Sequence, residues 1–158
     1  MNPSRRGLLL ASLTLGGAAA PVLPSEPMEL TVGRAFTIAV PQGSSLRQGP
    51  GDSTAGLIEG PGLILAFDYG VYADPLTADP NRRFTRQEPV VVDGRIGTLF
   101  VWPDPKRSGD SRLGLHIPIV TQTPLGPTRL TLVSDLAAPD DEARIRSMIA
   151  TIHFQRQS

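Results

Sequence analysis

The sequence has no cysteine, and among its 158 residues it has one tryptophan and two histidines. The lack of cysteine excludes disulfides, thiolate zinc sites, iron–sulfur clusters and cysteine nucleophiles. Two histidines are too few for a histidine-rich metal site, and no cofactor is expected. The 15 basic and 15 acidic residues balance, so no excess of positive charge favours nucleic acid as a partner. Aromatic residues are only 5% of the chain, against 40% hydrophobic residues. This composition predicts one domain with a mostly aliphatic core.

Residues 1–19 are typical of an export signal peptide. A basic start at Arg5 and Arg6 is followed by an apolar stretch over residues 8–20, with a small-residue cleavage position at Ala19. That stretch is shorter than the ~20 apolar residues that span a bilayer. The paired arginines resemble a twin-arginine signal, and an ordinary Sec signal is the alternative. We therefore expect a soluble periplasmic protein, without membrane insertion after signal cleavage.

The mature chain is expected to begin with an extended, proline-containing leader over residues 20–33, with ordered structure starting near Met28. A single domain over residues 34–155 follows. Its strands are predicted by alternating or continuous apolar patterns. Asp93-Gly94 is a strong hairpin signal, because both residues tolerate positive φ. Pro118 predicts an edge or a bulge in its strand, because proline has no N–H to donate. The predicted strand segments are 34–40, 63–69, 88–92, 95–102, 113–120 and 128–135.

One helix is predicted within residues 139–154. Its apolar residues recur at helical spacing and form one stripe, with Arg146 on the opposite face. Residues 152–154 are expected to return as a short strand. The predicted fold class is therefore α+β: a single antiparallel sheet of seven or eight strands with one C-terminal helix packed on it. The stripe consists of Ile145, Met148, Ile149 and Ile152.

Two predicted connections, 71–87 and 103–112, are longer than the usual ~4–6 residues. The first carries a basic segment that could contact an anionic partner or remain solvated; its arginines are Arg82, Arg83 and Arg86. Trp102, just before the second connection, is either a cap on the core or an exposed contact residue.

A candidate binding site comes from the turn at residues 59–62. Its proline favours a hairpin that brings residues 51–54 beside residues 67–70. If residues 60 and 61 are central, Ser53 faces Asp68; if residues 61 and 62 are central, the pairing slips by two residues without changing faces. The predicted binding residues are Asp52, Ser53, Asp68, Tyr69 and Tyr72.

Two alternative functions involve the acidic and polar residues that this hairpin would bring together. A periplasmic hydrolase would use Ser53 or the Asp52/Asp68 pair. A serine nucleophile needs a base within hydrogen-bond reach. Both histidines, His116 and His153, lie downstream of Ser53, whereas the trypsin-like pattern has its histidine upstream. Neither belongs to an Asp-x-x-His pattern like that of the GDS-type lipases, and His116 is expected on the surface of a strand. The second alternative is a weak divalent-cation site, because carboxylates are the ligands of hard cations. Its candidate ligands are Asp52, Asp68, Asp74 and Asp79.

Several short motifs together resemble a group of uncharacterised exported bacterial proteins that are similar in shape to the PsbP-like α/β domain. The motifs are an F-x-I-x-x-P strand, D-S-x-x-G, F-D-Y-G, V-D-G-R and a C-terminal I-x-F. The resemblance covers about residues 34–155. It implies a non-enzymatic accessory or binding module with an unknown protein or small-molecule partner in the periplasm. The matching residues are Phe36, Ile38 and Pro41; Asp52, Ser53 and Gly56; 67–70; 92–95; and Ile152 with Phe154.

Overall fold

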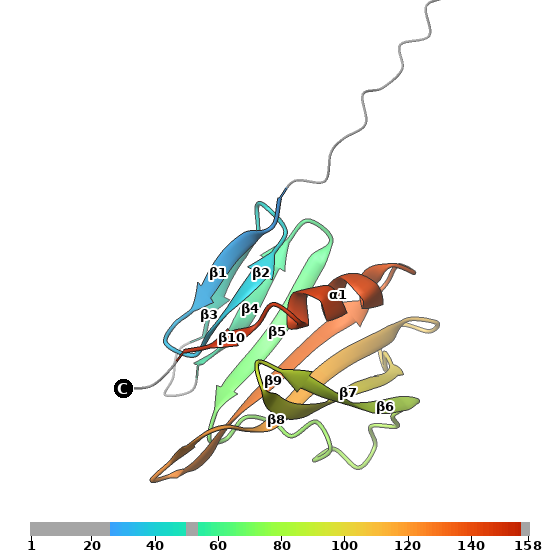
Figure 1. The fold of residues 1–158 in the computed structure, drawn as a ribbon. Helices are drawn as coiled ribbons and strands as arrows, with labels where there is room; N and C mark the ends of the chain where they lie inside the picture. Colours follow the sequence, from blue (N-terminus) through green and yellow to red (C-terminus); the bar gives the residue numbers. More distant parts are fainter. Residues whose placement is uncertain (1–25, 50–53, 156–158) are drawn as a thin grey trace, which may run out of the picture.

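The computed structural model describes residues 26–49 and 54–155, which form two β-sheets and one short helix (Figure 1). Strands make up 56% of these residues and the helix 7%. The small sheet has the order β1-β2-β10, with β1 (Met28–Val32), β2 (Phe36–Val40) and β10 (His153–Phe154). The large sheet has the order β3-β4-β5-β9-β8-β7-β6. Its strands are β3 (Ser45–Gln48), β4 (Thr54–Gly60), β5 (Leu63–Gly70), β6 (Arg86–Val92), β7 (Arg95–Pro103), β8 (Ser111–Thr123) and β9 (Gly126–Leu136), and the helix is α1 (Asp141–Ile149).

The prediction of a single sheet with a helix packed on it is wrong. The strand Phe36–Val40 is not part of the large sheet. It pairs with Met28–Val32 on one side and with His153–Phe154 on the other. Apolar alternation identifies which face of a strand is buried, but it does not identify the strand's neighbours. The first of these neighbours, Met28–Val32, lies within residues 20–33, which were expected to be an extended leader.

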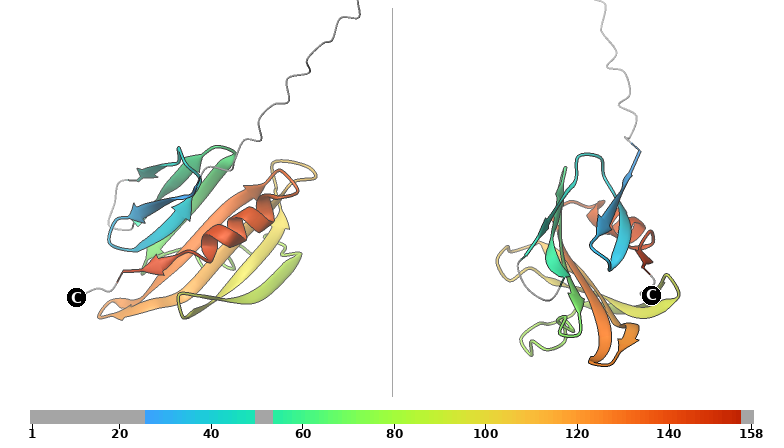
Figure 2. Two further views of the ribbon diagram at one scale, coloured as in Figure 1. Left: turned by 45° about the horizontal axis from the view of Figure 1, so that its top comes forward. Right: turned by 90° about the vertical axis from the view of Figure 1, so that its left-hand side faces the viewer.

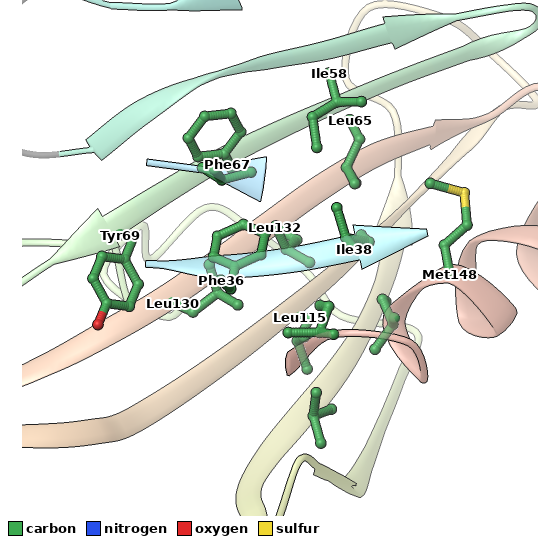
Figure 3. Packing of buried hydrophobic residues seen from close by; sticks show 14 of the residues in the cluster. Phe36, Ile38, Ile58, Leu65, Phe67, Tyr69, Leu115, Leu130, Leu132 and Met148 are labelled. Atoms are coloured by element: carbon green, nitrogen blue, oxygen red, sulfur yellow. The ribbon is translucent and has the colours of Figure 1, made fainter. Parts of the chain in front are cut away.

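The main core lies between the two sheets. Phe36 and Ile38 of β2 are fully buried, and they point toward the apolar face of β5 and β9 (Figure 3). The ring of Phe36 meets that of Phe67 edge-on, with 6.1 Å between centroids. Figure 2 shows the small sheet and α1 on one side of the large sheet. We call the opposite side of the large sheet its outer face.

The helix completes the layer formed by the small sheet. The predicted stripe is confirmed, since Ile145, Met148 and Ile149 are buried in the main core. Arg146, expected on the solvent side, instead forms ion pairs with Glu142 and with Glu88 of β6. These contacts connect α1 to the edge strand of the large sheet. Within the described residues, no helix has the length and apolar character needed to cross a membrane.

Two local predictions about turns and bulges are confirmed. Asp93 and Gly94 join β6 to β7 with φ of 47° and 77°, and β8 is irregular just after Ile117, where Pro118 lies. The Asp93 carboxylate also accepts a hydrogen bond from the N–H of Phe154 at 2.9 Å. This bond, opposed by desolvation, lowers the pKa of Asp93. Asp93 therefore connects the large sheet to the small one.

A candidate ligand pocket on the outer face of the large sheet

The long connection between β5 and β6, residues 71–85, packs on the outer face of the large sheet. It lies on the side opposite α1 (Figure 2, right). The connection covers a second, smaller core, in which Leu76 is buried with Phe100 and Trp102 of β7. Phe84 meets the Trp102 ring edge-on at 5.8 Å between centroids. Each face of the large sheet is therefore at least partly covered, one by the small sheet and α1 and the other by this loop.

A glycine in β8 allows Trp102 and Leu76 to lie close to the sheet. A Cβ at Gly114 would be 2.7 Å from Leu76 Cδ1 and 2.9 Å from the Trp102 ring. Such distances are shorter than van der Waals contact, so any larger residue would displace the loop or the indole. Gly114 thus determines how the indole sits on the outer face.

The 71–85 connection has an ordered conformation with its own hydrogen bonds. Leu76 has a φ of 61°, a backbone conformation that costs a non-glycine residue on the order of 1 kcal/mol or more. Its N–H donates to Asp74 Oδ1 at 2.8 Å, and its carbonyl accepts from Arg82. The Arg82 guanidinium also lies over the Trp102 ring, 5.3 Å from the centroid. These contacts hold Leu76 in its strained position above the sheet.

His116 takes part in anchoring this connection, so the expectation that it lies on the surface is wrong. Its side chain is buried, and its Nδ1 lies 2.9 Å from the hydroxyl of Thr131 on β9. The Thr131 hydroxyl donates its proton to the carbonyl of Asp74. It must therefore accept from His116, which places the imidazole proton on Nδ1. Burial lowers the pKa of His116, so the ring is neutral near pH 7.

A pocket of about 580 Å³ opens between this connection, the 104–110 connection and the outer face. Strands β5, β7, β8 and β9 form its floor, and the two connections form its walls. Apolar surface predominates in the lining. The lining residues are Ala66, Phe67, Asp68, Asp74, Leu76, Asp79, Asn81, Arg82, Arg83, Trp102, Pro103, Pro105, Arg112, Thr131 and Val133. We refer to this cavity as the sheet-face pocket.

Two arginines of the pocket are already neutralised by carboxylates. Arg82 lies 3.9 Å from Asp74. Arg112 lies 3.6 Å from Asp104, whose side chain is buried, and its Nε lies 3.0 Å from Asp135. The last contact is an ion pair without the angle of a hydrogen bond. These pairs shape the walls of the pocket and cancel the charge of both guanidiniums.

The predicted binding residues do not share one surface. Asp52 and Ser53 lie outside the described residues. Asp68 is in the lining of the sheet-face pocket. Tyr69 points into the main core, where its hydroxyl lies 3.5 Å from that of a threonine on β9. Tyr72 is 90% exposed. Alternation along β5 separates Asp68 from Tyr69, because successive side chains of a strand point to opposite faces.

The β4–β5 hairpin has the second of the two registers allowed by its turn. Thr54 pairs with Tyr69, and Ala55 pairs with Asp68. Gly62 adopts a φ of 61°, which glycine tolerates without strain. The residue directly opposite Asp68 on β4 is therefore an alanine.

Of the proposed cation ligands, Asp68, Asp74 and Asp79 are described, and all three line the pocket. Asp74 donates its N–H to Asp68 Oδ2 at 3.3 Å, and Asp79 accepts from Asn81 at 2.9 Å. Within residues 26–49 and 54–155, no three histidine or acidic side chains are grouped closely enough to hold a metal ion.

Sequence reasoning did not identify this pocket, although two of its signals were present. The two long connections were recognised, and they form its walls. Trp102 was left as either a core cap or a contact residue, and it is both buried and part of the lining. The sequence did not show on which face of the sheet the two long connections fold.

Comparison with known proteins adds no assignment. No protein-family model matches the chain, and a search of curated proteins finds no significant match.

Proposed function

We propose that the protein is an exported binding module of the bacterial cell envelope that takes up a small molecule in the sheet-face pocket. The observation that carries this proposal is the pocket itself: about 580 Å³, within the range of small-molecule sites, which are mostly apolar with a few polar groups. The walls include a connection in which Leu76 is held in a strained conformation. Strain of this kind concentrates at ligand sites.

Binding rather than catalysis is favoured by the roles of the charged groups. Arg82 and Asp74 hold the 71–85 connection, and Arg112 is paired with two carboxylates. His116 anchors the loop through Thr131. Groups engaged in this way shape the walls of the cavity and hold its loop in place.

Export is supported by the signal-like residues 1–19 and by the resemblance of several short motifs to those of uncharacterised exported bacterial proteins. An envelope location would expose the pocket to small molecules of the periplasm. It would also fit a chain without cysteine, which does not depend on the oxidising chemistry of that compartment.

The experiment is to recover the ligand from periplasmic extract. Purified protein is incubated with the extract, washed, and denatured, and the released small molecules are identified by mass spectrometry. The variant Ala66→Phe fills the pocket floor from β5. Ile64→Phe is its matched control, because Ile64 lies on the same face of the same strand, is 58% exposed and is not in the lining.

We expect wild type and Ile64→Phe to release the same compound, and Ala66→Phe to release little of it. A compound retained equally by all three proteins, or by none, would contradict the proposal. Circular dichroism of the two variants checks that each remains folded.

A further inference from the structure

Among the charged groups of the sheet-face pocket, Asp68 differs from the others. It lies on β5 at the pocket floor and is half-buried. Its one hydrogen bond in the described part of the chain is the 3.3 Å contact with the N–H of Asp74, and no basic side chain there pairs with it. Arg129, on the same face of β9, donates instead to the carbonyl of Val71 at 2.9 Å.

In the part of the chain that the structure describes, two further charged side chains of the lining have no ionic partner. Arg83 and Asp79 are both exposed, so water screens them, and their charges are of opposite sign. The arginines deeper in the walls are neutralised by carboxylates, as described above. Asp68 is the carboxylate of the pocket floor that has no ionic partner within the described residues, so it gives the floor a negative charge.

From this arrangement we propose that the ligand is an amphiphilic amine: an apolar body carrying a protonated nitrogen. The nitrogen binds the carboxylate of Asp68, and the body packs against Trp102, Leu76 and Val133. The face of Trp102 does not serve the cation, because Arg82 already lies over that ring. This inference rests on the proposed function, whose pocket it uses, and adds the chemical class of the ligand.

The test compares three probes with one apolar body and different head groups: phenylbutylamine, phenylbutanol and phenylbutyrate. Trp102 is the only tryptophan of the chain and lines the pocket, so its fluorescence reports binding at this site. We expect the amine to bind at least about tenfold more tightly than the alcohol or the carboxylate. A hydrogen bond to a charged group contributes enough for that difference once the bound apolar body covers the carboxylate.

Variants identify the carboxylate responsible. Asp68→Asn should remove the preference for the amine and leave the affinity for the alcohol unchanged. Asp68→Glu should retain most of the preference, because it keeps the charge. Glu29→Gln, an exposed position on β1 of the small sheet, is the control for a general change in protein charge and should behave as wild type.

Three results would overturn the inference: no response to the amine, tighter binding of the carboxylate, or an amine preference that survives in Asp68→Asn. The experiment with periplasmic extract distinguishes a failure of this inference from a failure of the proposed function. A released compound without a basic nitrogen would refute only the assignment of the ligand as an amine. Release that is insensitive to Ala66→Phe would refute the pocket as the binding site.

Discussion

Replacing Gly114 by alanine should damage the sheet-face pocket in a way that can be measured without knowing the ligand. The added Cβ would lie 2.7 Å from Leu76 Cδ1 and 2.9 Å from two atoms of the Trp102 ring. The terminal methyl groups of Leu76 can shift by rotation of the side chain, but the indole is a rigid ring packed between β8 and the 71–85 connection. The substitution should therefore move Trp102 away from the sheet.

The magnitude follows from two opposing contributions. Overpacking of a well-packed site costs about 1–3 kcal/mol. Alanine restricts the unfolded chain more than glycine does, which returns about 0.4–1 kcal/mol. The two ranges leave a net loss between about 0 and 2.6 kcal/mol in the free energy of unfolding, and we expect a value near the middle, about 1.3 kcal/mol. Urea unfolding followed by circular dichroism measures this loss, and the emission spectrum of the native protein reports the position of Trp102.

Gly97→Ala is the matched control on the other face of the large sheet. A Cβ at Gly97 would lie 2.9 Å from the backbone oxygen of His116 and 2.9 Å from a side-chain atom of Ile117. It should be destabilising to a similar or greater extent and yet leave the emission of Trp102 unchanged. A Gly114→Ala protein with wild-type stability and wild-type emission would refute the packing described for the outer face.

Further predictions concern the helix, the hairpin that joins the sheets and the export signal. Ile149→Ala should cost about 2–5 kcal/mol in urea melts, whereas exposed Ser147→Ala should stay within about 0.5 kcal/mol; equal losses would contradict the buried face of α1. The pKa of Asp93 is held below its ordinary value of 3.8, so its carboxylate stabilises the fold above that pH and the effect is lost as pH falls through the lowered pKa. The stability difference between wild type and Asp93→Asn should accordingly be full at neutral pH and vanish in strong acid, while a difference independent of pH would refute this. Exchanging Arg5 and Arg6 for lysines should leave precursor in the cytoplasm if the signal is of the twin-arginine type; normal export of that variant in a fractionation assay would indicate the Sec route.

The local features that sequence predicted well are those determined by neighbouring residues. The Asp93-Gly94 turn forms because both residues accept positive φ. The irregularity after Ile117 follows from a proline that has no N–H to donate. The buried stripe of α1 follows from the 3.6-residue period. Each depends on interactions within a few residues, and each is present in the structure.

The candidate site was less accessible to sequence reasoning. Asp68 was predicted as a binding residue from the pairing of residues 51–54 with 67–70 in the hairpin, and the structure places it in the lining of the sheet-face pocket. Tyr69 was grouped with it by adjacency, although alternation places the two on opposite faces. Arg146 shows the same limit: helical spacing put it opposite the apolar stripe, but Glu88 of β6 lies there and pairs with it.

The sequence by itself determined the buried faces of β2 and of α1, the turn at Asp93-Gly94 and the positions of the two long connections. Those properties follow from the period of each element and from the φ preferences of Gly, Pro and Asp, all of which act over short distances. Only the tertiary structure decided that β2 joins β1 and β10 in a separate sheet, and that the 71–85 connection covers the outer face above Gly114. Both depend on contacts between segments far apart in the chain, and many pairings are compatible with the same apolar pattern, because burial is non-directional.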